Sequence, residues 1–223
     1  MPLIPRGFDI AAARRHLRKA DPALGDWMRR IGPLEHDFER RFDPVDALAR
    51  AILYQQLAGN AAAAIVARVE ARMPRARRID AAGIAVLDET QLRECGVSRN
   101  KIAALKDLAA KAAEGVVPTT RRLAFMDDEA VVEALTQVRG IGRWTVQMML
   151  MARLGRPDVF PVHDLGVRKG AQVVRGLATM PSPDETFALG AHWAPYRSLA
   201  SFYLWRIASA AQPPAKKVKR SQD

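Results

Sequence analysis

The chain has 223 residues, of which 49% are hydrophobic and 26% are charged, a composition typical of a globular protein with a sizeable core. Its single cysteine, Cys95, excludes a disulfide framework and any zinc site or iron–sulfur cluster that needs several thiolates of this chain. No apolar run reaches the roughly 18 residues that span a bilayer, and the N-terminus has no secretory signal. We therefore expect a cytoplasmic protein that does not bind membranes.

The charge balance points to a polyanionic partner. Lysine and arginine number 35 against 24 aspartates and glutamates, a net charge of +11. Most of this excess lies in the body of the chain, because residues 212–223 contain only four cations and one acid. Nucleic acid is the commonest partner of such a protein. The alternative is an arginine-rich protein that binds no polyanion.

Helical periodicity runs through almost the whole chain, and most predicted helices have a recognisable first residue. An aspartate or serine N-cap, a first-turn proline or a glycine turn marks each start. These starts are Asp21-Pro22, Asp43-Pro44, Ser98, Asp127, Gly142, Asp164 and Pro195. No alternating strand is found, since residues 158–161 are short and interrupted by proline. The sequence therefore predicts an all-α fold of about ten helices.

The end of the chain differs from the rest in composition. Residues 212–223 contain a Pro-Pro pair followed by lysines and an arginine. Such a segment is typical of a disordered basic tail. It would either tether the protein to DNA or be a solvated terminus without a function.

The most specific segment lies between residues 135 and 146. One helix ends, the turn Gly140-Ile141-Gly142 follows, and a new helix begins at once. Glycines allow positive φ and close approach of another backbone, and the amides of a helix N-terminus attract anions. Gly140, Gly142, Arg143 and Thr145 are therefore candidates for binding a DNA phosphate. The alternative is a tight helix–helix turn without a ligand.

A second motif follows this hairpin, with Pro161-Val162 before Asp164 and Val167 after it. Together with Leu135 and Thr145, which flank the glycine turn, these residues resemble the helix-hairpin-helix DNA glycosylase superfamily. The resemblance is to its branch of bacterial DNA-3-methyladenine glycosylase II and the yeast relatives. It runs from about residue 42 to 207 and includes residues 50–56 and 193–198.

The resemblance implies two helical lobes with a cleft between them. Residues 42–156 would form the central lobe with the hairpin, and residues 1–41 with 157–211 would form the other. The chain resembles a compact form without the N-terminal β-domain of the longer bacterial enzymes.

The same resemblance assigns the chemistry. Asp164 matches the family's catalytic aspartate, and a carboxylate stabilises the positive charge that builds on the sugar when an N-glycosidic bond breaks. Trp144 and Trp205 match the aromatic residues of the base pocket, with Tyr54 and Met148 as further wall residues. An aromatic face attracts a cationic alkylated purine by roughly 0.5–2 kcal/mol. Without the motifs, Asp164 would be read as a simple N-cap and the tryptophans as core.

Position 144 separates two reaction types. Members of the superfamily that cleave the DNA strand carry a lysine there, whose amine attacks the sugar. A tryptophan cannot form a Schiff base, so we expect a glycosylase without lyase activity.

Two further features follow from the family's pattern. Gln56 matches the residue that fills the gap left by the flipped base, with Leu57 as the neighbouring candidate; a helix-capping role for Gln56 is the alternative. The hairpin of relatives often holds Na⁺ or K⁺ through backbone carbonyls, which here would be those of Thr136, Val138 and Ile141.

The sequence thus predicts a monofunctional DNA glycosylase that excises 3-methyladenine and 7-methylguanine from damaged double-stranded DNA. It would be a monomer of the bacterial cytoplasm, bound to the nucleoid, needing no cofactor and no iron–sulfur cluster. A glycosylase for uracil, oxidised or mismatched bases and a non-catalytic DNA-binding protein are the alternatives. A plain phosphate clamp would need neither Asp164 nor the two pocket tryptophans.

Overall fold

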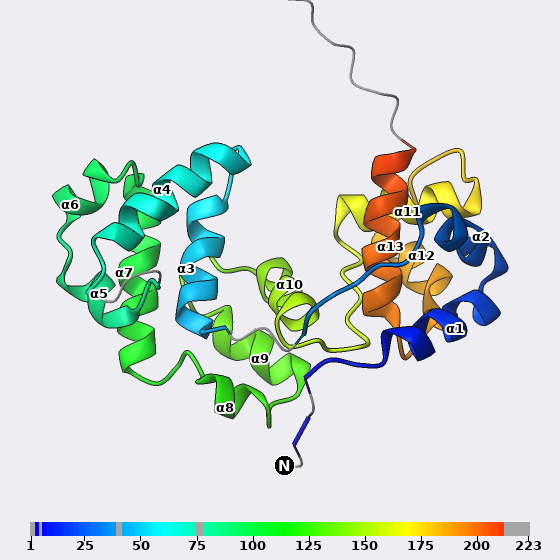
Figure 1. The fold of residues 1–223 in the computed structure, drawn as a ribbon, viewed down its shortest axis with the longest axis horizontal. Helices are drawn as coiled ribbons and strands as arrows, with labels where there is room; N and C mark the ends of the chain where they lie inside the picture. Colours follow the sequence, from blue (N-terminus) through cyan, green and yellow to red (C-terminus); the bar gives the residue numbers. More distant parts are fainter. Residues whose placement is uncertain (1–2, 5, 39–41, 75–77, 212–223) are drawn as a thin grey trace, which may run out of the picture. The chain divides into compact units, whose positions relative to one another are not determined.

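The computed structural model describes residues 3–4, 6–38, 42–74 and 78–211, and the predicted basic tail lies outside them. Figure 1 shows the helices in chain order. They are α1 (Ile10–Ala20), α2 (Pro22–Ile31), α3 (Pro44–Tyr54), α4 (Gly59–Ala71), α5 (Ala81–Val86), α6 (Glu89–Glu94), α7 (Arg99–Ala113), α8 (Thr120–Leu123), α9 (Asp128–Leu135), α10 (Arg143–Ala152), α11 (Leu165–Arg175), α12 (Pro183–Leu189), the 3₁₀ helix η1 (Ala191–Trp193) and α13 (Arg197–Ala210).

The all-α prediction is confirmed, since the described residues contain helices and no strand. They contain more helices than the ten expected, because α5, α6 and α8 are only four to six residues long. Helices this short show too little periodicity to be recognised in a sequence. Among the described residues, no helix is both long and apolar enough to cross a membrane.

Most predicted helix starts are confirmed by hydrogen bonds of the N-cap side chain. Asp21, Asp43 and Asp127 each accept a bond from a backbone amide of the first turn of the helix that follows. Ser98 stands at the N-cap of α7, but its side chain makes no capping bond. The last helix begins at Arg197, two residues after the expected proline.

The chain divides into two compact units. Unit 1 comprises the described residues of Met1–Gly7 and Asp37–Arg156, and unit 2 those of Phe8–His36 and Pro157–Asp223. The first residues belong to unit 1 because their backbone amides bind it: Ile4 N donates to Ala124 O, and Gly7 N donates to Leu154 O.

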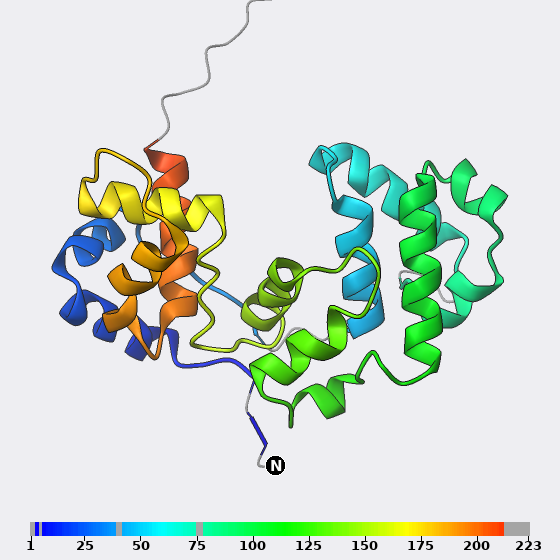
Figure 2. The same ribbon diagram turned by 180° about the vertical axis from the view of Figure 1, so that it is seen from behind.

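In unit 1, α7 lies between α3 and α5 and contacts both, as the two opposite views show (Figures 1 and 2). Its buried face carries Ile102, Leu105 and Leu108, whose spacing of three residues matches the helical period. Helices α9 and α10 pack against each other and are joined by the predicted hairpin. The apolar faces of these helices therefore hold the hairpin and the end of α3 in one body.

In unit 2, α11 and α13 make the most extensive helix–helix contact (Figure 1). A β-carbon on Gly170 of α11 would lie 2.3 Å from the backbone oxygen of Leu204 in α13. The two helices therefore approach more closely than any other residue at this position would allow. Their apolar faces join those of α1 and α2 in a core that includes Leu17, Leu24 and Trp193.

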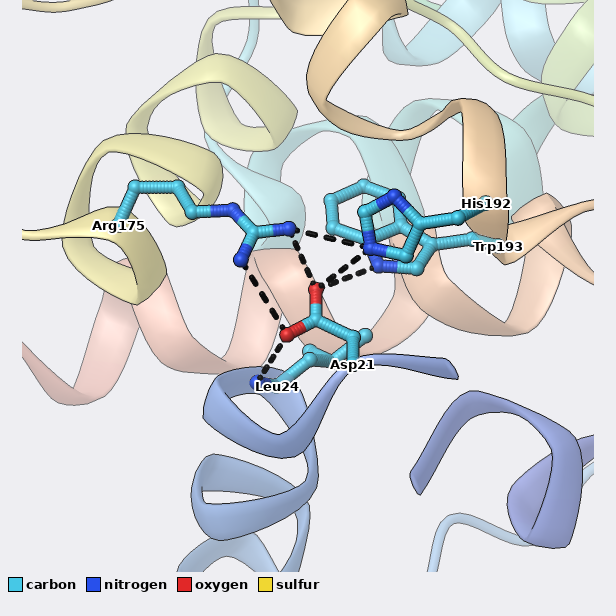
Figure 3. Close-up of polar contacts among 5 residues, drawn as sticks. All are labelled: Asp21, Leu24, Arg175, His192 and Trp193. Atoms are coloured by element: carbon cyan, nitrogen blue, oxygen red, sulfur yellow. Dashed lines mark hydrogen bonds and ion pairs between the residues drawn. The ribbon is translucent and has the colours of Figure 1, made fainter. Parts of the chain in front are cut away.

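A buried carboxylate ties the segments of unit 2 together. The side chain of Asp21 is 1% exposed and accepts bonds from Leu24 N (3.0 Å), Trp193 Nε1 (2.7 Å) and Arg175 Nη2 (2.7 Å), with His192 Nε2 at 3.2 Å (Figure 3). Burial acts to raise the pKa of Asp21, but these hydrogen bonds and the charge of Arg175 outweigh it, so the pKa lies below its ordinary value. One N-cap thus connects the start of α2 to α11 and η1.

Candidate active site

The predicted hairpin joins α9 and α10 through a tight glycine turn. Gly140 has a φ of +78°, a conformation that side-chain-bearing residues rarely adopt. Gly142 is the N-cap of α10 and offers no side chain to bind the first amides of the helix. The positive N-terminus of α10 is therefore open to an external anion at this point.

Two side chains of unit 1 fix the hairpin backbone. Asp107 of α7 accepts a bond from the amide of Arg139 (2.7 Å). Gln55, at the end of α3, donates its Nε2–H to the carbonyl of Gly140 (2.8 Å). The turn is thus held before any ligand arrives.

Arg143, a predicted phosphate contact, has an acidic neighbour. Its guanidinium forms a two-pronged ion pair with Glu129 of α9, in which Nη1 and Oε2 are 3.0 Å apart. The bond from Arg143 lowers the pKa of Glu129. Both side chains are more than half exposed, so water screens the ion pair. Replacement of Glu129 by a phosphate as the partner of Arg143 would therefore cost little free energy.

A cavity of about 610 Å³ opens beside the hairpin within unit 1. Three predicted pocket residues line it, namely Tyr54, Trp144 and Met148, together with the predicted plug residue Gln56 and the predicted phosphate contact Thr145. The fourth predicted pocket residue, Trp205, belongs to unit 2, where it binds Asp164. Trp144 is 52% exposed and Tyr54 is 43% exposed, so neither is a core residue. The volume of the cavity falls in the range of small-molecule pockets.

The cavity offers aromatic and thioether surface more than charge. Two arginines, Arg50 and Arg153, line it, and the guanidinium of Arg50 is bound by the carboxylates of Asp46 (2.9 Å) and Glu70. Trp144, Tyr54 and Met148 supply flat or polarisable apolar surface. Such a lining suits the π-face of a planar ring.

The predicted plug residues lie in the turn between α3 and α4. Gln56 is exposed and has a φ of +57°, the one positive φ of a non-glycine residue in the described part of the chain. Leu57 follows it and is 40% exposed. Both side chains therefore project from a sharply bent backbone.

The predicted catalytic aspartate begins α11 in unit 2. Asp164 Oδ1 accepts a bond from the amide of Val167 (2.9 Å), as an N-cap does, and a second bond from Trp205 Nε1 (2.7 Å). Trp205 lies on α13, and its indole N–H binds the carboxylate directly. These two bonds fix the orientation of the carboxylate.

A glycine makes this contact sterically feasible. A β-carbon on Gly166 would lie 2.6 Å from Cδ1 of Trp205 and 3.1 Å from Oδ1 of Asp164. No residue larger than glycine fits at position 166 unless the indole moves. The sequence alone does not predict this role, although Gly166 lies between the motif residues Asp164 and Val167.

Nothing in the sequence predicts the other residues that hold the hairpin and the plug turn in place. Gln55, Asp107 and Lys101 touch the hairpin or the plug turn only because distant parts of the chain meet there. No spacing within the sequence predicts these contacts.

The structure contains no side-chain metal site among the residues it describes, since no group of three or more His, Cys, Asp or Glu side chains comes together there. The carbonyls expected to bind Na⁺ or K⁺ belong to Thr136, Val138 and Ile141. The amide of Ile141 donates to Val138 O (3.0 Å), which curls the backbone at this point. A carbonyl oxygen has a second lone pair, so this bond does not prevent Val138 O from binding a cation.

Comparison with known proteins places this arrangement in a family. A sequence model of the HhH-GPD superfamily of base excision DNA repair proteins matches residues 49–195. The DNA-3-methyladenine glycosylase 1 of Schizosaccharomyces pombe is 35% identical over 169 residues, which cover 76% of this chain and 74% of that protein. The putative DNA-3-methyladenine glycosylase YfjP of Bacillus subtilis is 40% identical over 123 residues, covering 55% and 42%.

A solved structure has the same fold. The 3-methyladenine DNA glycosylase of Schizosaccharomyces pombe in complex with abasic DNA superposes with a TM-score of 0.79 at 32% identity, covering 90% of this chain and 98% of that one. The family match includes both the hairpin and Asp164. The chain belongs to the HhH-GPD superfamily of base excision DNA repair proteins.

Proposed function

We propose that the protein is a monofunctional DNA glycosylase that releases alkylated purines, such as 3-methyladenine and 7-methylguanine, from damaged double-stranded DNA. The observation that carries the proposal is the carboxylate of Asp164, held by Trp205 and Val167 at a helix start of a base excision repair protein. The similarity to proteins named DNA-3-methyladenine glycosylases supports the choice of substrate.

Breakage of the N-glycosidic bond leaves positive charge on the sugar. In the proposed mechanism the base leaves with the electron pair of the bond, and the carboxylate of Asp164 stabilises the charge on the sugar and orients the water that attacks the anomeric carbon and gives up a proton to solvent. Alkylated purines are good leaving groups because they are cationic. The reaction therefore needs no cofactor and no strong general acid.

The base must leave the duplex before its bond can break, at a cost of a few kcal/mol. We assign the cavity of unit 1 to the extruded base, because Trp144 and Tyr54 are exposed and a cationic ring is attracted to aromatic faces. Gln56, or Leu57 beside it, would fill the space that the base leaves.

The hairpin would bind the DNA backbone. A phosphate at the N-terminus of α10 would meet the amides near Gly140 and Gly142, with Arg143 and Thr145 close by in the sequence. The carbonyls of Thr136, Val138 and Ile141 would hold Na⁺ or K⁺, since backbone carbonyls are ligands for monovalent cations. Such an ion would add positive charge beside the phosphate.

The test is release of free base from methylated duplex DNA by wild type and by Asp164→Asn. Asparagine keeps an oxygen that accepts the bonds from Val167 and Trp205 and remains a good N-cap. We therefore expect a folded variant that binds DNA but releases base about 100- to 1,000-fold more slowly. Asp127→Asn is the matched control, because Asp127 caps α9 in the same way.

The outcomes separate the alternatives. Undiminished release by Asp164→Asn would contradict the assigned role of the carboxylate. A wild-type protein that releases only uracil, oxidised or mismatched bases would contradict the substrate. A protein that binds DNA and releases no base from any of these duplexes would be a DNA-binding protein without glycosylase activity.

A further inference from the structure

One lysine of α7 binds the backbone where α3 ends and the plug turn begins. Lys101 Nζ donates to Leu53 O (2.7 Å) and to Gln55 O (2.8 Å). Carbonyls at a helix C-terminus lack N–H donors within the helix and form its negative end, so an ammonium group is stabilising there. Partial burial lowers the pKa of Lys101 below its ordinary value.

The residue that follows this pair of bonds has an unfavourable backbone conformation. Gln56 has a φ of +57°, which a side chain with a β-carbon disfavours. Such a conformation persists only where the surrounding structure fixes it. Lys101 binds the carbonyl of Gln55, directly before Gln56, and the side chain of Gln55 binds the hairpin at Gly140 O.

We propose that Lys101 is a positioning residue that holds the 55–57 turn in the bent conformation from which Gln56 enters the DNA stack, and that Gln55 couples this turn to the phosphate-binding hairpin. The inference rests on the proposed function, because it takes Gln56 as the plug. It gives Lys101 a part in base extrusion, although Lys101 touches neither the base nor the sugar in the proposed mechanism.

The same helix contains a matched control. Lys106 Nζ donates to Ile84 O (2.8 Å) and Ala85 O (3.0 Å) and also to Leu87 O, all at the end of α5. Lys106 thus stabilises a helix end with the same kind of contact, without touching the plug turn. Replacement of either lysine by methionine keeps the aliphatic chain and removes the donors, so their structural costs are comparable.

The first measurement is hydrogen exchange of backbone amides in the free protein. In Lys101→Met we expect the amides of residues 54–58 to exchange about tenfold faster, because the fixed turn opens more often. Lys106→Met should accelerate exchange around residues 84–88 and leave the plug turn unchanged. Equal exchange at 54–58 in wild type and Lys101→Met would overturn the proposal.

The second measurement uses a duplex with a tetrahydrofuran abasic site and 2-aminopurine opposite it, whose fluorescence reports insertion of the plug. We expect Lys101→Met to bind this duplex within about twofold of wild type but to insert several-fold more slowly, with Lys101→Arg restoring most of the rate. In a Gln56→Ala background the loss of Lys101 should have no further effect, because the two residues act through one step. An equal effect of Lys101→Met with and without Gln56 would overturn the proposal.

This inference and the proposed function can fail separately. If wild type releases no methylated base, the proposed function fails, while both measurements on the free protein and the abasic duplex still decide the role of Lys101. If wild type releases base and Lys101→Met matches it in exchange and insertion, the role of Lys101 alone is refuted.

Discussion

Two glycines of α11 allow residues of α13 to come into close contact with α11. Gly170 lets the backbone of α13 come near, and Gly166, one helical turn earlier, leaves the space that the indole of Trp205 occupies next to Asp164. The catalytic carboxylate of the proposed mechanism therefore depends on a residue that has no side chain. The addition of one methyl group at this position should therefore lower the activity.

Gly166→Ala should displace Trp205 and lower base release by roughly 10- to 100-fold, the effect of one hydrogen bond to a charged group. Release from methylated duplex DNA under single-turnover conditions measures it. Trp205→Phe removes the same donor and adds no volume, so it should lower release in the same direction. If only Gly166→Ala is impaired, the bond from Trp205 is not what orients Asp164.

Trp144 determines the type of reaction that we expect. An indole cannot form the imine that a lysine amine forms with the sugar. Sodium borohydride should therefore trap no covalent adduct between the wild-type protein and methylated duplex DNA, as judged by a denaturing gel. A trapped adduct would show that another amine of the chain attacks the sugar.

At the scale of elements, the hairpin between α9 and α10 combines a turn that needs a glycine at positive φ with a helix N-terminus. Gly140→Val places a β-branched residue at a φ of +78° and should distort the turn. We expect DNA affinity to fall about tenfold or more, with a smaller dependence on salt if a phosphate contact is lost. Equilibrium binding at several salt concentrations measures both.

Gly115→Val is the control for this change. Gly115 has a φ of +75° and no atom within 4 Å of its added β-carbon, so valine causes a similar strain at the end of α7. It should cost comparable stability and leave DNA affinity unchanged. Equal losses of affinity in both variants would mean that general destabilisation, and not the hairpin, accounts for the effect.

Local signals explain which elements the sequence predicts. Asp21, Asp43 and Asp127 bond to amides two or three residues away, so their capping roles are encoded within one turn. Ser98 has the right residue type and position, but its side chain makes no capping bond. The short helices α5 and α6 also have aspartate N-caps, yet six residues provide too little periodicity to support them.

In the candidate site, too, the sequence identifies the residues that belong to local motifs and not the tertiary contacts that hold them in place. Motifs within the sequence identify Asp164, Trp144 and the glycine hairpin, and the family match covers all three. The residues that hold them in place meet through tertiary contacts: Trp205 lies 41 residues from Asp164, and Gln55 lies 85 residues from Gly140. Spacing in one sequence carries no information about such contacts.

At the scale of the whole molecule, stability should depend on pH through Asp21. Its pKa is lower in the folded protein than the ordinary value of 3.8, so the carboxylate contributes stability above that value. This contribution is lost as the pH falls through the lower, folded pKa. We therefore expect the free energy of unfolding to decrease below about pH 4.

Asp21→Asn measures the size of this effect. At pH 7 the variant should be about 2–3 kcal/mol less stable, because Arg175 loses a charged partner while the N-cap bond is kept. The difference should shrink when urea denaturation is repeated at pH 3. A difference that is the same at both values would show that the charge of Asp21 is not what stabilises unit 2.

The assembly of unit 2 from both ends of the chain has a consequence for synthesis on the ribosome. Unit 1 has its main segment in one piece, Asp37–Arg156, whereas α1 and α2 pack with helices made after it. Trp193 follows Asp21 by 172 residues. At roughly 5–20 residues per second, Asp21 waits roughly 10–30 seconds for that partner. During this interval Leu17 and Leu24 lack the apolar partners that α11, η1 and α13 supply to their core, so the apolar surface of the nascent α1 and α2 stays exposed.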